Sequence, residues 1–265
     1  MQRADKLLFE KGLAKSRSAA QTLINEKKVL CRGRLVLKPS ELLEEDDELT
    51  VTEPQKYVSR GGLKLEHALR VFGVSVKDDV CADIGASTGG FTQVLLKQGA
   101  KRVYAVDVGY NLLAWKLRND ERVRVMERTN ARMLRPGDIP ESLDLGVTDV
   151  SFISLKAILP PVFRLLAPDA DFVALIKPQF EAQKEEVGEK GVVRDQDTHI
   201  KVVSDIVVFC RENGFSPVGL DFSPITGPEG NMEFLLHLKN RAGVGSVTEE
   251  IIRDTVCAAH VNFGV

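Results

Sequence analysis

The sequence predicts an α/β protein: a Rossmann-like, seven-stranded sheet with an antiparallel last strand, preceded by a small α+β unit. From about residue 59 onward, short apolar runs alternate with helix-length segments, which is typical of parallel strands joined by crossover helices. The turn-rich segment 223–231 is too short for a crossover helix, so the two strands beside it should pair antiparallel. The expected strands lie near residues 80–84, 103–108, 123–127, 143–148, 172–177, 217–222 and 233–238.

The first fifty residues have a different pattern. Residues 3–30 show apolar residues at helical spacing and predict two short helices, the first of which ends at Gly12. After them, Arg32-Gly33-Arg34 separates two apolar runs and indicates a hairpin. The expected strands of this unit are Val29–Cys31, Leu35–Leu37 and Leu49–Val51. We therefore expect a small domain over residues 1–52, a linker over 53–58, where nothing periodic persists, and a large domain over 59–265.

Charge is distributed unevenly along the chain. The formal net charge is −2, yet residues 1–40 contain ten Lys or Arg residues against Asp5, Glu10 and Glu26. A local excess of positive charge favours a polyanionic partner for the N-terminal part, although a solvated helix face gives the same composition.

The cysteines and the apolar runs exclude several classes of protein. The four cysteines form no C-x-x-C or Cys/His cluster, so we expect neither a metal site nor a disulfide framework. No charged-then-apolar leader and no uncharged run of about eighteen apolar residues is present. These observations favour a cytoplasmic protein without a membrane partner. The cysteines are Cys31, Cys81, Cys210 and Cys257.

A glycine-rich turn, Asp83-Ile84-Gly85-Ala86-Ser87-Thr88-Gly89-Gly90-Phe91, follows the first strand of the large domain. Its glycines permit a ligand to approach the backbone closely before a helix begins. The next strand ends at Asp107, which is suited to accept hydrogen bonds from two ribose hydroxyls. The pattern predicts an adenosine pocket, and its departure from G-x-G-x-x-G fits S-adenosylmethionine, which has no pyrophosphate. A purely structural turn is the alternative.

The same turn also matches the G-x-S-x-G pattern of serine hydrolases, from Gly85 to Gly89. Three histidines, His199, His237 and His260, follow it. However, the turn comes after the first strand of its domain, where the hydrolase elbow is expected later in the sheet, and no oxyanion-loop motif precedes it. The hydrolase is therefore the weaker interpretation.

Four charged residues lie where they could reach this pocket. Asp149 and Lys177 end predicted parallel strands, whose carboxyl ends face the ligand crevice. Glu233 begins the last strand, and Lys64 begins a helix before the first. Singly, Asp149 could be a helix N-cap and the others surface charges, but four such groups around one turn favour a site. The polar stretch 181–198 is a candidate lid or an ordinary solvated loop.

With these residues the chain resembles the TlyA type of proteins, often labelled hemolysin A, whose catalytic domain is similar to FtsJ-type 2′-O-ribose methyltransferases. The seven-stranded layout is also that of the common methyltransferase sheet. The resemblance covers essentially the whole chain. Its most specific pieces are Ser59–Leu65, Asp83–Phe91, Val106–Tyr110, Glu127–Arg132, Asp149–Ser154 and Lys177–Glu181.

The resemblance implies S-adenosylmethionine-dependent 2′-O-methylation of ribosomal RNA, with a cytidine of large-subunit rRNA as the expected target and small-subunit rRNA as a further candidate. The N-terminal module looks like the RNA-binding fold named for ribosomal protein S four, in which Arg3 and Arg17 would touch RNA. The family's catalytic Lys, Asp, Lys, Glu tetrad falls on Lys64, Asp149, Lys177 and Glu233. The implied partners are ribosomal RNA and ribosomal subunits.

The expected cofactor contacts combine the turn, Asp107 and Asp149 with two residues that the resemblance adds beside the adenine, Asn130 and Ala131. The turn residues among them are Asp83, Gly85, Ala86, Ser87, Gly89, Gly90 and Phe91. Two other functions remain open: a membrane-active hemolysin, for which no spanning helix or amphipathic hairpin set is visible, and a non-catalytic ribosome-binding protein, which the intact tetrad disfavours.

Overall fold

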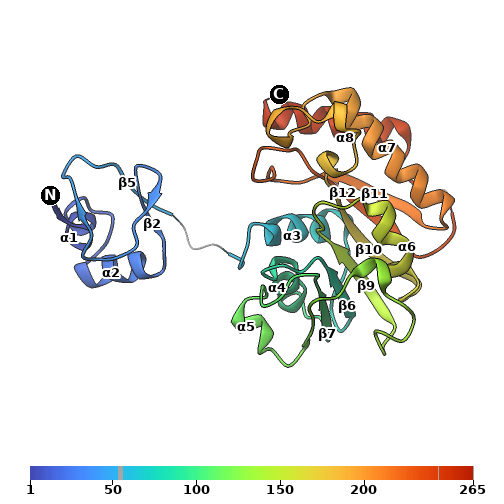
Figure 1. Ribbon diagram of the computed structural model, residues 1–265, viewed down its shortest axis with the longest axis horizontal. Helices are drawn as coiled ribbons and strands as arrows, with labels where there is room; N and C mark the ends of the chain where they lie inside the picture. The colour runs from blue at the N-terminus through green and yellow to red at the C-terminus, as the bar shows by residue number, and fades with distance from the viewer. Residues whose placement is uncertain (53–55, 244, 265) are drawn as a thin grey trace. The chain divides into compact units, whose positions relative to one another are not determined.

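The computed structural model describes residues 1–52, 56–243 and 245–264 (Figure 1). The chain divides into two compact units, residues 1–55 and 56–265, and each has its own hydrophobic core. Of the expected linker, residues 53–55 lie outside the described residues, as does the last residue of the expected large domain. Lys56–Val58 belong to the second unit, in whose core Tyr57 is buried.

The first unit consists of two short helices and short antiparallel strands, as the sequence predicts. The side chain of Ser16 caps the second helix, because its Oγ accepts a hydrogen bond from the Ala19 amide at 3.1 Å. The elements are β1 (Gln2–Arg3), α1 (Ala4–Glu10), α2 (Arg17–Asn25), β2 (Val29–Cys31), β3 (Arg34–Leu35), β4 (Leu42–Leu43) and β5 (Leu49–Val51). A pair of two-residue strands, β1 and β4, was not predicted, since so short a pair leaves no periodic pattern.

The expected hairpin is present, but its second strand begins one residue early. Arg32 and Gly33 both have positive φ angles, +49° and +78°, and form a two-residue turn that pairs Cys31 with Arg34. The second strand is therefore Arg34–Leu35 rather than Leu35–Leu37.

The second unit is built on a seven-stranded sheet of order β11-β12-β10-β9-β6-β7-β8. Strand β12 runs antiparallel to both of its neighbours, and the other described pairs in this sheet are parallel. The strands are β6 (Val80–Ile84), β7 (Arg102–Val106), β8 (Val123–Met126), β9 (Leu143–Thr148), β10 (Leu166–Ile176), β11 (Ser216–Phe222) and β12 (Phe234–Lys239). The predicted sheet with its antiparallel strand is confirmed.

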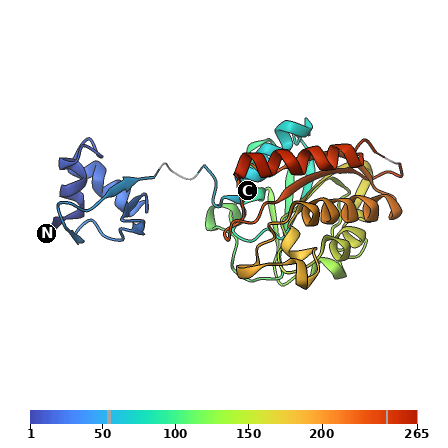
Figure 2. The ribbon, with the colours of Figure 1, turned by 90° about the horizontal axis from the view of Figure 1, so that it is seen from above.

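Helices cover both faces of this sheet (Figures 1 and 2). Helices α3 to α5 pack on one face and α6 to α8 on the other, so that in β6 Cys81 and Ala82 belong to opposite cores. The α-helices are α3 (Gly61–Phe72), α4 (Gly90–Lys97), α5 (Trp115–Arg118), α6 (Leu155–Phe163), α7 (Gln196–Glu212) and α8 (Glu249–Phe263). Short 3-10 helices occupy Ala131–Met133, Pro178–Phe180, Lys184–Glu186 and Glu189–Gly191. Among the described residues, no helix combines the length and the apolar character needed to cross a membrane.

The stretch 181–198, a candidate lid from its sequence, contains two of these 3-10 helices and the beginning of α7. The buried side chain of Asn231 holds it: Asn231 Oδ1 accepts from the Val193 amide at 3.0 Å, and Nδ2 donates to the Gly191 carbonyl at 2.9 Å. The stretch is thereby joined to the segment that leads into β12.

Candidate active site

Two adjoining pockets, of about 350 and 380 Å³, open where the parallel strands β6, β7 and β9 end. Both are lined by Gly85, Ser87, Asp149 and Ser151, so they form one continuous crevice. This is the edge at which α/β sheets bind ligands.

The glycine turn forms the floor of this crevice. Gly85 has a φ of +84°, and a Cβ atom there would lie 3.0 Å from the Asp149 carbonyl oxygen. Of the turn residues expected to contact a cofactor, all but Gly89 line the first pocket. A Cβ on Gly89 would meet Leu117 at 2.4 Å, so packing against α5 accounts for glycine at that position.

Gly90 lets helix α3 approach α4 closely. A Cβ atom on Gly90 would lie 2.2 Å from Ser59 Oγ and 3.0 Å from the Gly62 amide nitrogen. Lys64 lies in the first turns of α3, so this close approach determines where its side chain enters the pocket.

Asp83 carries a buried acceptor at the pocket wall. Its Oδ2 accepts hydrogen bonds from the Thr92 amide at 2.8 Å and from Thr92 Oγ1 at 2.6 Å, whereas Oδ1 has no hydrogen-bond partner among the described residues. Burial raises the pKa of this carboxyl to about 7, although the two Thr92 hydrogen bonds oppose the rise. A buried, unpartnered carboxyl oxygen fits a ligand that brings a cation or a hydrogen-bond donor.

Asp107 stands at the carboxyl end of β7, in the second pocket. Its two oxygens accept hydrogen bonds from the Ser87 amide at 2.8 Å and the Gly109 amide at 2.7 Å, which fix the carboxylate. Asn130 and Ala131 line the same pocket, together with the apolar side chains of Val106 and Ile158. A carboxylate beside an apolar pocket suits a ribose joined to an adenine ring.

The four charged residues predicted as a tetrad line the first pocket as two ion pairs. Lys64 donates to Glu233, and Lys177 Nζ lies 2.5 Å from Asp149 Oδ1. Both lysines are buried, and burial raises the pKa of Glu233, while the ammonium of Lys64 opposes the rise.

The reversed direction of β12 brings Glu233 into this group. Phe234, its first residue, pairs with Ile176, the last residue of β10. Glu233, which precedes β12, and Lys177, which follows β10, therefore meet at the same edge of the sheet. Without this reversal the residue before a strand would lie at the opposite edge.

Three further residues at this edge were not singled out from the sequence. Ser151 Oγ accepts a hydrogen bond from Lys177 Nζ at 2.9 Å, and Thr92 holds Asp83. Phe152 is 89% exposed at a φ of +62°, and its ring lies 5.0 Å from that of Phe180. Ser151 could have been found from its place two residues after Asp149, but the exposure and backbone angle of Phe152 leave no trace in the sequence.

The histidines do not form a hydrolase site with Ser87. His67 pairs with Asp221, His237 with Asp171, and His199 with His260. The Ser87 amide instead donates to Asp107. No group of three or more potential ligand residues with metal-binding geometry occurs in the part of the chain that the structure describes.

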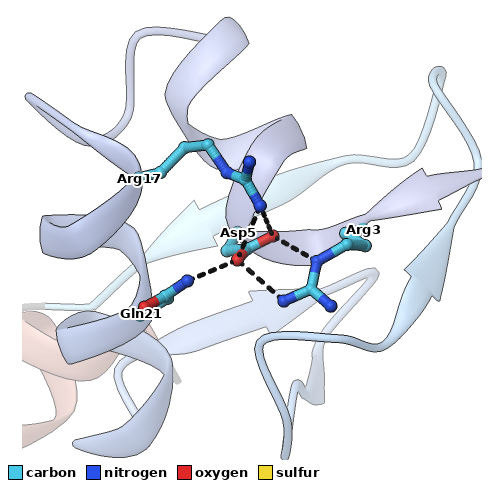
Figure 3. A network of polar contacts seen from close by, with 4 residues as sticks. All are labelled: Arg3, Asp5, Arg17 and Gln21. Atoms are coloured by element: carbon cyan, nitrogen blue, oxygen red, sulfur yellow. Dashed lines mark hydrogen bonds and ion pairs between the residues drawn. The ribbon is translucent and has the colours of Figure 1, made fainter.

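The two arginines expected to touch RNA lie in the first unit, in contact with one buried carboxylate. Arg3 and Arg17 both pair with Asp5, at 2.9 and 3.3 Å (Figure 3).

Comparisons with known proteins agree with this architecture. A family model described as FtsJ-like methyltransferase matches residues 57–240, and a model described as S4 domain matches residues 2–49. The 16S/23S rRNA (cytidine-2′-O)-methyltransferase TlyA of Mycobacterium tuberculosis is 46% identical over 90% of each chain. The 23S rRNA (cytidine-2′-O)-methyltransferase TlyA of Campylobacter jejuni is 34% identical over 85% of this chain and 95% of its own.

Among solved structures, a candidate hemolysin from Streptococcus thermophilus is 46% identical, with a TM-score of 0.79 over 99% of this chain and 97% of that one. Fold, sequence and structural similarity thus agree over both units. The chain belongs to the FtsJ-like methyltransferase family, in the group that includes TlyA.

Proposed function

We propose that this protein transfers a methyl group from S-adenosylmethionine to the 2′-hydroxyl of a ribose in ribosomal RNA. The observation that carries the proposal is that two Lys–carboxylate pairs, Lys64–Glu233 and Lys177–Asp149, share one pocket with the glycine turn. The names of the TlyA relatives suggest a cytidine as the target: both name 23S rRNA, and that of the Mycobacterium tuberculosis relative also names 16S rRNA. Ribosomal substrates imply that the protein works in the cytoplasm.

The crevice fits S-adenosylmethionine in three respects. Asp107 would accept hydrogen bonds from the ribose hydroxyls, and Asn130 and Ala131 would lie beside the adenine. The unpartnered Oδ1 of Asp83 would face the ammonium group of the methionine part. The turn residues Gly85, Ala86 and Ser87 line the first pocket, where they would border the methionine part, and glycine at position 85 lets this turn pass close to the Asp149 backbone.

Bound S-adenosylmethionine supplies an electrophilic methyl group, and the residues of this chain must hold and deprotonate the ribose hydroxyl that accepts it. We assign the proton to Lys177: in the uncharged form of its amine, the lone pair on Nζ would receive the proton as the O–H bond breaks. Asp149 fixes the lysine, and the Lys64–Glu233 pair would position the ribose through hydrogen bonds on the opposite wall.

The target nucleotide must leave its helix to reach a pocket between strand ends. Phe152 supports such an entry, since an exposed aromatic ring at the pocket wall can stack on an extruded base. A bulky residue at a positive φ is uncommon, and backbone strain of this kind clusters at functional sites. The first unit would supply affinity through phosphate contacts.

Methyl transfer onto isolated 30S, 50S and 70S particles tests the proposal. Purified protein with labelled S-adenosylmethionine should modify at least one particle, and mass spectrometry of the digested RNA should find 2′-O-methylcytidine. Lys177→Ala should lower the rate by at least about 100-fold, the contribution of a general base, with cofactor affinity intact. Lys77→Ala, at an exposed lysine outside the crevice, is the matched control. Near-normal transfer by Lys177→Ala contradicts the role of Lys177, and no transfer by the wild type contradicts the function.

A further inference from the structure

A buried carboxylate lies at the centre of the first unit's arginine pair (Figure 3). Asp5, in the first turn of α1, has no exposed surface. Arg3 donates to it from two nitrogens, at 3.0 and 2.9 Å, and Gln21 Nε2 donates at 2.7 Å. Arg17 reaches both carboxylate oxygens from one terminal nitrogen, at 3.5 and 3.3 Å. Both oxygens of Asp5 are therefore satisfied from three separate positions.

Each of the two guanidinium groups contacts the buried carboxylate of Asp5 on one side and solvent on the other. The side chains of Arg3 and Arg17 are 43% and 51% exposed, although the carboxylate that joins them is not exposed at all. The hydrogen bonds from Arg3 keep the pKa of Asp5 well below its usual range, against the opposing effect of burial, so the carboxylate is charged at neutral pH. Two arginines on one carboxylate leave a net positive charge at this point.

Each guanidinium has N–H groups to spare. An arginine offers five N–H donors; Arg3 uses its Nε and one terminal nitrogen on Asp5, and Arg17 one terminal nitrogen. Planar guanidinium donors match phosphate oxygens in geometry. An arginine side chain also has large rotamer entropy, and the part of it already lost in the free protein is not lost again on binding.

We propose that Asp5 is a positioning residue for RNA binding: it fixes Arg3 and Arg17 as a pre-organised fork that binds a backbone phosphate. This inference rests on the proposed function and deepens its RNA-binding part. The surroundings favour a polyanion, because Lys11 and Lys15 are exposed in the loop that joins α1 to α2. The match of residues 2–49 to the S4 domain agrees with RNA as that polyanion.

For the variant Asp5→Asn, the proposal predicts a change in RNA affinity opposite to the change expected from net charge alone. Asp5→Asn removes a negative charge beside two arginines, so long-range electrostatics alone would tighten RNA binding. If Asp5 positions the arginines, the same change releases them and weakens binding. We expect about tenfold weaker binding, the equivalent of one charged hydrogen bond. The slope of log Kd against log salt should also become shallower by about one, as expected when one phosphate contact is lost.

Glu10→Gln is the matched control. It makes the same charge change in the same unit, but Glu10 is exposed and, among the described residues, its side chain pairs with Gln2 and Lys6 alone. Its affinity for RNA should stay within about twofold of wild type or become slightly tighter. Arg3→Lys and Arg17→Lys keep the positive charge but lose the planar guanidinium, so each variant should weaken RNA binding. Once both arginines are lysines, the further change Asp5→Asn should weaken binding little more, because Asp5 then has no guanidinium to position.

The experiment uses the full chain, a fluorescein-labelled RNA duplex of twenty base pairs for anisotropy, and 50S subunits for co-sedimentation. Weakened binding by Asp5→Asn with unchanged binding by Glu10→Gln supports the fork; equal or tighter binding by Asp5→Asn overturns it. If thermal unfolding shows that Asp5→Asn does not fold, the two lysine variants decide, and full affinity in both overturns the proposal.

A polyglutamate competitor tests the nature of the ligand. Displacement of the RNA by polyglutamate at equal charge concentration would show that the fork prefers carboxylates and would overturn RNA as its partner; failure to displace supports phosphate. A wild-type protein that binds RNA through the fork yet transfers no methyl group would contradict the proposed function and leave this inference standing.

Discussion

The ammonium of Lys64 meets the carboxylate of Glu233 across 169 positions of the chain, and the two side chains are only 8% and 2% exposed. Both side chains are too deeply buried for water to take the place of the missing partner if one of them is removed. Removal of one partner therefore leaves a buried charge without compensation, which is strongly destabilising, whereas removal of both leaves none.

Lys64→Met should lower the free energy of unfolding of the large unit by about 3 kcal/mol. The double variant Lys64→Met Glu233→Gln should recover much of this loss but none of the activity. Because burial raises the pKa of Glu233, the deficit of the single variant should be smaller at pH 5.5 than at pH 8. Urea unfolding at the two pH values measures it; a single variant as stable as wild type at pH 8 would mean that the pair is solvated.

The Asp83 carboxyl should make cofactor binding depend on pH. Its pKa in the folded protein is about 7, against an ordinary value of 3.8 for an aspartate, so it is largely neutral below pH 6 and charged above pH 8. Since its charged form attracts the cationic methionine part, affinity for S-adenosylmethionine should rise with pH through about 7, by up to tenfold per unit below it. Calorimetric titrations from pH 5.5 to 8 check this, with Asp83→Asn as the variant that should lose the trend.

The same group should lower the stability of the free protein as pH rises. The folded state keeps a proton that the unfolded chain releases above about pH 4, so stability falls between about pH 4 and pH 7 and then levels off. Asp83→Asn should remove this fall and stabilise the free protein at pH 8 by up to about 4 kcal/mol. Thermal unfolding without cofactor measures it, and a variant that retains the full decline would assign the decline to other groups.

Ser151 should contribute to the rate by orienting Lys177. Lys177 Nζ donates a hydrogen bond to Ser151 Oγ at 2.9 Å and forms an ion pair with Asp149 Oδ1 at 2.5 Å. The bond to Ser151 fixes the direction of the amine, and with it the direction of the lone pair that the uncharged amine would offer to the substrate. Ser151→Ala should therefore lower kcat about tenfold and leave the affinity for S-adenosylmethionine within twofold. Ser151→Thr keeps the hydroxyl and should restore kcat. A rise in KM without a change in kcat would indicate that Ser151 binds substrate instead.

Deletion of residues 1–52 should abolish methylation of ribosomal particles and leave the affinity for S-adenosylmethionine nearly unchanged. The core of the first unit, around Leu8 and Ile24, shares no residue with the two cores of the second. Calorimetry on the truncated protein measures cofactor affinity, and labelled methyl transfer onto 50S subunits measures activity. Continued methylation would place the RNA-binding determinants in the second unit.

Much of the site could be predicted because the ends of the strands can be recognised in the sequence. Asp149 and Lys177 follow apolar runs of strand length, and the short connection 223–231 was sufficient to predict the reversal that brings Glu233 to them. For Lys64 the sequence indicated only its place at the start of a helix before the first strand, and its catalytic role came from the family resemblance, since no sequence pattern states how closely α3 approaches α4.

Other features depend on contacts that no local pattern encodes. Gly89 was expected beside the cofactor, but glycine is needed there because Leu117 of α5 packs against it. Asp5 counted only as one acidic residue among many basic ones, because its partners at positions 3, 17 and 21 converge through the packing of α1 on α2.

The first turn of α3 rests against Gly90, where even a methyl group would collide with Ser59 Oγ and the Gly62 amide. Any larger residue would act as a wedge between the two helices and withdraw Lys64 from Glu233. The width of the pocket that receives the ribose thus depends on Gly90 having a hydrogen atom in place of a side chain, although Gly90 takes no part in the chemistry.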